Sequence, residues 1–268
     1  LDVMGMAQTG TGKTAAFTLP ILQKLNANQS VEKARDPRAL ILAPTRELAI
    51  QINDSIRNYG KYIALKHTVI FGGVKQGPQV KLLGKGMDII VATPGRLLDL
   101  INQGFCSLKK IECVVLDEAD RMLDMGFIRD VEKVVKILPV KRQSLFFSAT
   151  MPDSVIKLSE TMLKSPKQVK VKSTLTPVER IAQSVIVIEP QDKVLQLITL
   201  LKDKVFDSVI VFTRTKHKAN RICQKLISVG IQTEAIHSNK SQAARQRALN
   251  GFKDGNIKIL IATDIAAR

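Results

Sequence analysis

The sequence predicts an α/β protein with two successive, mostly parallel sheets. Short aliphatic runs recur along the 268 residues, and they are continuous rather than alternating, which is typical of strands buried on both faces of a parallel sheet. Amphipathic helical stretches lie between these runs, and this strand–helix alternation favours open α/β sheets. A stretch with little apolar periodicity, residues 165–180, interrupts the alternation before it restarts. The interruption indicates two lobes joined by a linker.

The first predicted lobe covers residues 1–165. It opens with a short apolar strand at 1–6, which leads through a glycine-rich turn into a helix at 14–25. The other expected elements are strands at 39–43, 67–71, 87–92, 113–116 and 144–147, and helices at 47–59, 96–102 and 129–138.

The predicted linker is 166–182, because this stretch is rich in lysines and contains Pro166 and Pro177. One short strand is expected inside it, at 168–171. The second predicted lobe is 183–268. Its expected elements are strands at 184–188, 209–212, 232–236 and 258–262, and helices at 193–201, 216–229 and 242–252.

The chain is strongly basic, with a net charge of +17 and a pI near 9.9. Such a surplus suggests a polyanionic partner, most simply nucleic acid, although composition alone leaves a generally basic surface equally open. Residues 183–268 contain 14 Lys or Arg and 7 Asp or Glu, so both predicted lobes are basic.

The three cysteines form no Cys-x-x-Cys pair and indicate reduced thiols rather than a metal or disulfide scaffold. No apolar run approaches the roughly 20 residues of a membrane helix, and the start has no secretory-signal pattern.

The glycine-rich turn after the first strand has the pattern of a phosphate-binding loop. Gly10 and Gly12 allow conformations that turn successive N–H groups around phosphate oxygens, and the start of the next helix adds positive potential. We expect Lys13 to reach the β- and γ-phosphates of a nucleotide and Thr14 to hold Mg²⁺. The alternative, an ordinary glycine turn before a helix, is disfavoured by the strand and helix that flank the loop. The candidate nucleotide-binding residues are Ala7, Gln8, Thr9, Gly10, Thr11, Gly12, Lys13 and Thr14, with Ala7 standing where the strict pattern has Gly.

Three carboxylates follow the strand expected at 113–116. Carboxyl ends of parallel strands meet at one sheet edge, which places Asp117 near the phosphate-binding loop. There Asp117 would hold Mg²⁺, and Glu118 would orient or deprotonate the attacking water. A helix N-cap is the alternative, but capping does not account for three carboxylates in four residues. The catalytic candidates are therefore Lys13, Asp117 and Glu118.

Together these motifs resemble the DEAD-box family of ATP-dependent RNA helicases. The resemblance covers nearly the whole chain and starts from the loop at 7–14 and Asp-Glu-Ala-Asp at 117–120. The second lobe is most similar to the bacterial RhlE-type branch. The other matching stretches, in the family's order, are 44–49 (Pro-Thr-Arg-Glu-Leu-Ala), Gly72-Gly73, 93–96 (Thr-Pro-Gly-Arg), 148–150 (Ser-Ala-Thr), 211–214 (Val-Phe-Thr-Arg), Gln242 with Arg245, and 262–268 (Ala-Thr-Asp-Ile-Ala-Ala-Arg).

The resemblance implies two RecA-like lobes that bind ATP with Mg²⁺, and RNA, across the cleft between them. The implied activity is RNA-stimulated ATP hydrolysis coupled to local unwinding of RNA duplexes, in the cytoplasm and without a membrane. Partners among ribosome-assembly or RNA-decay proteins are also expected. Coupling of hydrolysis to unwinding is assigned to Asp120, Ser148 and Thr150. The implied RNA-binding residues are Pro44, Thr45, Arg46, Gly72, Gly73, Thr93, Pro94, Gly95, Arg96, Thr213, Arg214, Gln242, Arg245 and Thr263.

Helix starts at the ends of the first-lobe strands support an RNA backbone site. Thr45 and Thr93 stand at N-cap positions, and Pro94 suits a first helical turn. Free N–H groups at such starts bind phosphate without reading sequence, and Arg46 and Arg96 can add charge-assisted contacts. One such site would be only a structural cap. Several at one edge of a +17 protein favour RNA.

We expect the chain to be cut at both ends, with an incomplete second lobe. The family carries an adenine-recognising Gln motif before the phosphate-binding loop and an arginine-rich motif after 268. An arginine of that kind contributes about 10³ to 10⁵ in rate in related NTPases, so weak ATP hydrolysis is expected of this chain alone.

His237 is expected to be structural rather than catalytic, and Ser238 follows it where the family usually has Gly. An ATP-gated RNA clamp remains an alternative function, whereas a different P-loop phosphotransferase is disfavoured by the second lobe.

Overall fold

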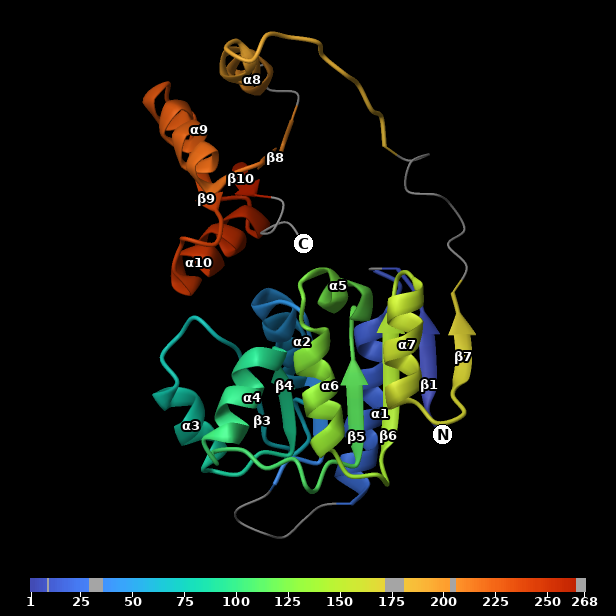
Figure 1. Cartoon of the computed structure of the whole chain (residues 1–268). Helices are drawn as coiled ribbons and strands as arrows, with labels where there is room; N and C mark the ends of the chain where they lie inside the picture. Colours follow the sequence, from blue (N-terminus) through green and yellow to red (C-terminus); the bar gives the residue numbers. More distant parts are fainter. Residues whose placement is uncertain (9, 29–35, 172–180, 203–205, 264–268) are drawn as a thin grey trace. The chain divides into compact units, whose positions relative to one another are not determined.

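The computed structural model describes residues 1–8, 10–28, 36–171, 181–202 and 206–263. The chain forms two compact units, Leu1–Thr176 and Pro177–Arg268, each of which is described by itself (Figure 1). Both contain a parallel sheet with helices, as the sequence predicts. Within the described stretches, no helix has the length and apolar character needed to cross a membrane.

The first unit is built on a seven-stranded sheet with the order β3-β4-β2-β5-β6-β1-β7, all pairs parallel. Leu40 and Leu42 of the central strand β2 belong to one core cluster, and Ile41 between them belongs to the other. Because side chains alternate between the two faces of a strand, burial of both faces requires the continuous apolar runs seen in the sequence. The strands are β1 (Val3–Met6), β2 (Ala39–Leu42), β3 (His67–Ile70), β4 (Ile89–Ala92), β5 (Cys113–Leu116), β6 (Gln143–Ser148) and β7 (Lys167–Lys170).

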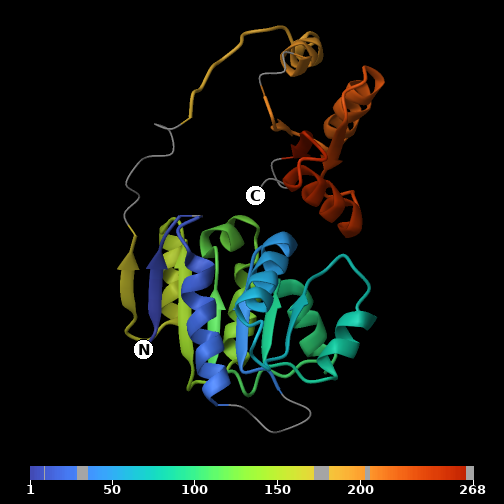
Figure 2. The same ribbon diagram turned by 180° about the vertical axis from the view of Figure 1, so that it is seen from behind.

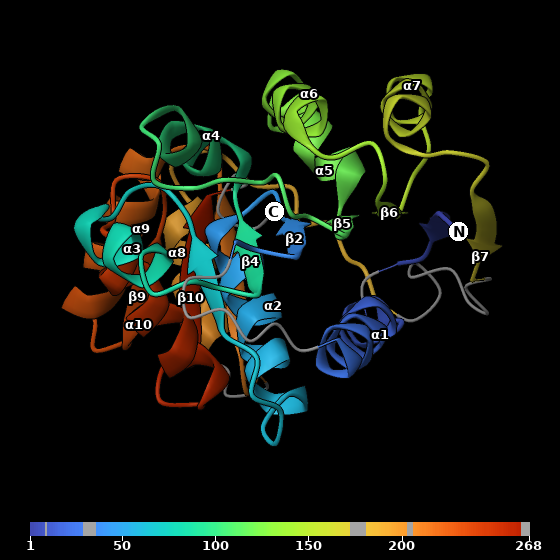
Figure 3. The same cartoon turned by 90° about the horizontal axis from the view of Figure 1, so that it is seen from below.

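Helices cover both faces of this sheet. One face packs against α1 and α2 and the other against α4, α6 and α7, so the unit has three layers (Figures 2 and 3). The helices are α1 (Lys13–Ala27), α2 (Arg46–Tyr59), α3 (Gly77–Leu83), α4 (Pro94–Asn102), α5 (Ala119–Asp124), α6 (Ile128–Ile137) and α7 (Asp153–Met162).

A buried ion pair ties together the amino-terminal edge of the sheet. Arg38 Nη2 lies 3.0 Å from Asp88 Oδ1 and donates a second hydrogen bond to the Leu25 carbonyl at 3.2 Å. Asp88 Oδ2 accepts from the Lys66 N–H at 2.9 Å. The pair therefore links the end of α1 to the starts of β2, β3 and β4, and leaves the carboxyl-terminal edge to the functional residues.

The strand expected inside the linker belongs to the first sheet. β7 pairs with β1 as an edge strand, beginning with Lys167 opposite Val3 (Figure 1). Asp2 holds this corner, because its Oδ1 accepts from the Ser144 N–H and its Oδ2 from the Lys164 N–H, at 2.8 and 2.7 Å. The linker predicted from residue 166 thus contains a strand of the first unit, and its residues 172–180 lie outside the described residues.

The second unit has a three-stranded parallel sheet with the order β8-β10-β9. Ile198, Ala219 and Leu226 from α8 and α9 pack on one face, and Ala248 from α10 packs on the other. The elements are α8 (Lys193–Lys202), β8 (Val209–Thr213), α9 (Lys216–Ser228), β9 (Thr233–Ile236), α10 (Gln242–Lys253) and β10 (Ile259–Thr263).

The prediction of a strand at 184–188 is wrong. No strand forms there, and the residues Val185 and Val187 are 90% and 94% exposed. The apolar residues of this segment fit a buried strand, but a strand also requires a neighbour with which to exchange hydrogen bonds. No described strand pairs with it, since the described partners of the second sheet are β8, β9 and β10 alone.

Candidate functional site

The glycine-rich turn forms the expected loop between β1 and α1. Gly10 and Gly12 have φ angles of 84° and 87°, the left-handed region that favours glycine, and Gly12 immediately precedes α1. A Cβ at either glycine would meet no atom within 4 Å, so glycine is needed there for backbone conformation and not for space. Thr11 Oγ1 donates to the Gln8 carbonyl at 2.7 Å, which closes the turn. Thr9, another predicted site residue, lies outside the described residues.

Ala7 is held by a neighbouring strand. Its N–H donates to the Ser148 carbonyl at 3.1 Å, and its side chain is 7% exposed. Alanine at the first position of the loop therefore fits the fold, because this residue extends the pairing of β1 with β6. The hydrogen bond between Ala7 and Ser148 therefore makes Ser148 a direct neighbour of the loop.

Lys13 presents a buried ammonium group at the base of this loop. Its side chain is 9% exposed, and its Nζ forms no hydrogen bond within the described part of the chain. The nearest acid is Asp117, whose Oδ1 lies 4.0 Å from Nζ. Asp117 at this distance supplies charge but no hydrogen bond, so the donors of the Lys13 ammonium remain available to a further anion such as a nucleotide phosphate.

Asp117 follows β5 at the same sheet edge and is 2% exposed. Burial raises the pKa of this carboxyl to about 6, against the lowering effect of Lys13. A metal cation beside Asp117 would stabilise its ionised form, and Thr14 in the first turn of α1 supplies a hydroxyl. The residues present therefore fit Mg²⁺ bound by few protein ligands together with phosphate oxygens. Among the described residues, no three His, Cys, Asp or Glu side chains are grouped so that they could hold a metal ion.

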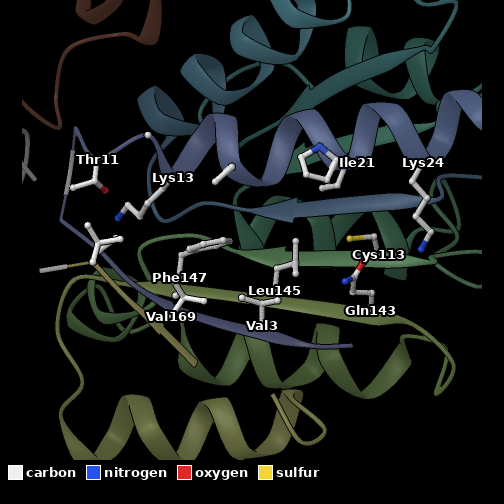
Figure 4. A pocket seen from close by; sticks show the side chains of 16 residues that line it. Val3, Thr11, Lys13, Ile21, Lys24, Cys113, Gln143, Leu145, Phe147 and Val169 are labelled. Carbon is white, nitrogen blue, oxygen red and sulfur yellow. The ribbon is translucent and has the colours of Figure 1, made fainter. Parts of the chain in front are cut away.

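An apolar pocket of about 330 Å³ lies beside the loop, between α1 and the sheet. Thr11 and Lys13 line one end and Lys24 and Gln143 the other, with apolar side chains such as Phe147 along the floor (Figure 4). These apolar side chains limit the access of water to the Lys13 ammonium. The lower local dielectric constant strengthens the attraction between this ammonium and an anion.

Glu118 lies between β5 and α5 in a left-handed conformation, with φ 54° and ψ 53°. This backbone is uncommon for a residue with a side chain, and such conformations cluster at functional sites. Arg121 Nη1 donates to Glu118 Oε2 at 2.8 Å. Arg121 was not predicted as a site residue. It follows Glu118 by three residues at the start of a helix, and side chains with this spacing lie close together, so the sequence did contain a signal for the pair.

Asp120 connects the acidic segment to the end of β6. Its Oδ2 accepts from both the N–H and the Oγ1 of Thr150, and its own N–H donates to Ser148 Oγ at 3.2 Å. Burial by itself would raise the pKa of Asp120, but hydrogen bonds from Thr150, Ser148 and the Arg121 N–H outweigh it and lower the pKa. The predicted coupling residues Asp120, Ser148 and Thr150 thus form one hydrogen-bonded group.

The candidate RNA-binding residues of the first unit gather at the carboxyl ends of β2, β3 and β4. Thr45 caps α2 by accepting from the Leu48 N–H at 3.2 Å. Thr93 occupies the N-cap position of α4, but its side chain forms no capping hydrogen bond, and Pro94 opens that helix. The same edge carries Pro44, Arg46, Gly72, Gly73, Gly95 and Arg96.

Two arginines hold the loop after β3. Gly73 has a φ of 76°, and a Cβ there would overlap the guanidinium of Arg46. Arg96 donates to the Val74 carbonyl through Nη1 and Nη2, each at 3.4 Å. Gly73 therefore serves a close approach between the loop and Arg46, a relationship that the sequence pattern did not show.

The second-unit candidates also lie at strand ends. Thr213 ends β8 and Thr263 ends β10, and the two are paired in register. Arg214 follows β8 and is exposed, while Gln242 and Arg245 lie in the first turn of α10. Two helix caps here were missed by sequence reasoning: Thr215 accepts from the Lys218 N–H, and Ser241 from the Ala244 N–H, each at 3.2 Å.

His237 follows β9 and is 1% exposed, with its Nε2 2.9 Å from Asn220 Oδ1. Burial and the nearby cations Lys240 and Lys216 lower the pKa of this imidazole. A buried, neutral histidine that ties α9 to the end of β9 supports the structural role that we expected of it.

The first sheet carries a glycine-rich loop with a buried lysine and, on a nearby strand, an acidic segment, and a second α/β unit follows it. These features are typical of the P-loop nucleoside triphosphatase fold class in its two-lobed form. Comparisons with known proteins agree. The family profile described as DEAD/DEAH box helicase matches residues 1–158, and the one described as helicase conserved C-terminal domain matches 192–268. The chain belongs to the DEAD/DEAH box helicase family.

Curated relatives include the DEAD-box ATP-dependent RNA helicase CshA of Geobacillus kaustophilus, strain HTA426, which is 43% identical over 267 residues. The ATP-dependent RNA helicase DeaD of Escherichia coli, strain K12, is 41% identical over 268 residues. Both alignments cover 100% of this chain, but 56% of CshA and 42% of DeaD, so the chain spans about half the length of these relatives. The narrower resemblance to the RhlE-type branch stays a prediction.

Solved structures support the RecA-like fold. A DEAD box protein from the hyperthermophile Methanococcus jannaschii is 38% identical with a TM-score of 0.59, over 100% of this chain and 70% of that one. Saccharomyces cerevisiae Dbp5 bound to RNA and ADP BeF3 is 30% identical with a TM-score of 0.81, over 100% of this chain and 66% of that one. The predicted fold class, α/β with RecA-like lobes, is confirmed.

Proposed function

We propose that this chain is the catalytic part of an ATP-dependent RNA helicase, in which RNA-stimulated ATP hydrolysis drives local unwinding of RNA duplexes. The observation that carries the proposal is the buried Lys13 Nζ, which lies 4.0 Å from Asp117 and lacks a hydrogen-bond acceptor among the described residues. Family membership gives the reaction class, and the two compact units correspond to the two helicase lobes.

The loop residues would bind the phosphates of ATP. N–H groups at Gly10 to Gly12 and the ammonium of Lys13 supply positive charge, and Thr14 with Asp117 would hold Mg²⁺. When bound, Mg²⁺ neutralises charge that develops on the phosphate oxygens. Glu118 would accept a proton from the attacking water.

RNA would be held through its backbone at the carboxyl edges of the two sheets. Support comes from the capped helix start at Thr45, from the arginines Arg46 and Arg96, and from the similar fold of Dbp5, a protein whose solved structure contains RNA. Backbone contacts carry no sequence information, so we expect little sequence preference. For single-stranded RNA, the slope of log affinity against log salt is expected to be about −0.7 per phosphate contacted.

Substitution of the loop lysine tests the proposal. Lys13→Ala is expected to abolish ATP hydrolysis and ATP-dependent strand displacement, while RNA binding without nucleotide persists. Lys157→Ala is the matched control, because Lys157 is an exposed lysine on α7, which covers the opposite face of the sheet from α1. Undiminished strand displacement by Lys13→Ala would overturn the proposal. ATP-dependent RNA binding by the wild type with no strand separation would indicate an ATP-gated RNA clamp.

Family membership is also the basis for two finer proposals, a cytoplasmic location and partners among ribosome-assembly or RNA-decay proteins. Cell fractionation checks the location. Sedimentation with ribosomal precursors, compared between wild type and Lys13→Ala, checks the first class of partner.

A further inference from the structure

Arg121 contacts two of the three carboxylates in the acidic segment. Its Nη1 donates to Glu118 Oε2 at 2.8 Å, and its backbone N–H donates to Asp120 Oδ1 at 3.0 Å. The side chains of Arg121 and Glu118 are 25% and 15% exposed, whereas those of the similarly spaced pair Arg57 and Asp54 are 64% and 43% exposed. The pair at the site is therefore shielded from water, which strengthens it relative to an ordinary surface pair.

The three carboxylates differ in which oxygens remain available. Asp117 is buried beside Lys13, and both oxygens of Asp120 accept hydrogen bonds, from the Arg121 N–H and from Thr150. Glu118 uses Oε2 for Arg121, and within the described ranges its Oε1 accepts no hydrogen bond. Asp117 is also bonded through one oxygen, since its Oδ1 accepts from the Glu118 N–H at 3.0 Å, but it is only 2% exposed. Glu118, whose side chain is 15% exposed, is thus the more accessible carboxylate that keeps one oxygen for a water molecule while the other is fixed.

The Glu118 carboxylate requires a cationic partner such as Arg121 to hold it in place. Its left-handed backbone places it outside the regular turns of α5, and the neighbouring Asp117 and Asp120 repel a third negative charge. The guanidinium of Arg121 stays positive throughout the accessible pH range and lies one helical turn away. Since Asp120 is bonded to Thr150 and Ser148, the first turn of α5 that carries Arg121 is itself anchored to the end of β6.

We propose that Arg121 is a positioning residue for ATP hydrolysis, which holds Oε2 of Glu118 so that Oε1 is directed at the attacking water. This inference rests on the proposed function, because it requires that Glu118 act on that water. Arg121 does not contact the reacting atoms. It acts through the ion pair with Glu118.

Single-turnover ATP hydrolysis, measured with protein in excess, tests this role even when the rate is low. Arg121→Gln removes the charge while keeping a polar side chain, and it is expected to lower the hydrolysis rate constant about tenfold, part of the 10² to 10⁴ that general base catalysis contributes. Affinity for a fluorescent ATP analogue with Mg²⁺ is expected to stay unchanged, and the thermal midpoint to fall by about 4 °C at most. Arg121→Lys restores part of the rate, and Arg57→Gln, which breaks the exposed pair on α2, leaves the rate unchanged.

A double-mutant cycle separates positioning from general disruption. In a Glu118→Gln background, Arg121→Gln is expected to cause no further loss, because the two residues act as one unit. The same fold loss in both backgrounds, an unchanged rate in the single variant, or a parallel loss of nucleotide affinity would each overturn the inference. If Lys13→Ala abolishes hydrolysis and Arg121→Gln has no effect, this inference alone fails. If the wild type hydrolyses no ATP, the proposed function fails and the inference fails with it.

Discussion

Thr150 donates two hydrogen bonds to a single oxygen of Asp120, because its backbone N and its Oγ1 both lie 2.8 Å from Oδ2. This contact joins the segment after β5, where hydrolysis is proposed, to the end of β6. Ser148 closes the group by donating from Oγ to the Thr150 carbonyl at 2.7 Å. A displacement of residues 148–150 therefore reaches the acidic segment without an intermediate.

Thr150→Ala is expected to uncouple hydrolysis from unwinding. It removes one of the two bonds to Asp120, a change of about 1 kcal/mol at this exposed site, and leaves Lys13, Asp117 and Glu118 in place. ATP hydrolysis should stay within a few-fold of the wild type while strand displacement is lost. Thr161→Ala on α7 is the control, since Thr161 Oγ1 bonds only to its own helix, at Leu158. Equal losses of hydrolysis and displacement in Thr150→Ala would contradict a coupling role.

Asp117 makes the nucleotide-free protein less stable as pH rises. Burial raises its pKa from the ordinary 3.8 to about 6, so between these values the folded state binds more protons than the unfolded state. The contribution of Asp117 to the free energy of unfolding therefore falls with rising pH in that window, by roughly 3 kcal/mol at most. Asp117→Asn should flatten the dependence and stabilise the protein at pH 7, while binding of Mg²⁺ and ATP is lost. Urea denaturation between pH 4 and 7 without Mg²⁺ and nucleotide checks this, and an unchanged slope in Asp117→Asn would contradict it.

The sequence predicted the sheet of the first unit and the residues around Lys13 because both rest on local patterns. Strands buried on both faces require continuous apolar runs, and the loop requires glycines at Gly10 and Gly12 with a fixed spacing to Lys13. The order of strands then brings the ends of β1, β6 and β5 together, which places Ser148 between the loop and the acids.

Features that depend on partners distant in sequence were missed. β7 is exposed at all four positions and carries no apolar signal, so its membership of the first sheet follows from pairing with β1. The segment at 184–188 has the opposite character, an apolar run without a described neighbour. The contact of Arg46 with Gly73 joins residues from different strand ends, and no spacing within the sequence reports it.

The pair of Arg38 and Asp88 is expected to be essential for stability. Both side chains are nearly inaccessible, at 8% and 0% exposure, and four elements, α1, β2, β3 and β4, meet at their hydrogen bonds. Asp88→Ala leaves a buried guanidinium without its counter-ion, and removal of one partner of a buried pair costs about 3 to 5 kcal/mol. Breaking the exposed pair with Arg57→Ala should cost below about 1 kcal/mol. Urea unfolding of both variants measures the difference, and similar losses in the two would contradict the structural role of the buried pair.

Gly73→Ala is expected to weaken RNA binding more than it weakens the fold. Gly73 has a φ of 76°, so any side chain there is strained by about 1 kcal/mol, and its Cβ would displace the guanidinium of Arg46. Loss of one charge-assisted phosphate contact corresponds to roughly tenfold in affinity. Gly104→Ala is the matched control, because Gly104 has a φ of 78° and an added Cβ would meet no atom within 4 Å. Both variants should lose similar stability, whereas RNA affinity, measured by fluorescence anisotropy without nucleotide, should fall only in Gly73→Ala. Equal RNA affinities would show that the displacement of Arg46 does not matter for RNA, and would remove Arg46 from the candidate interface.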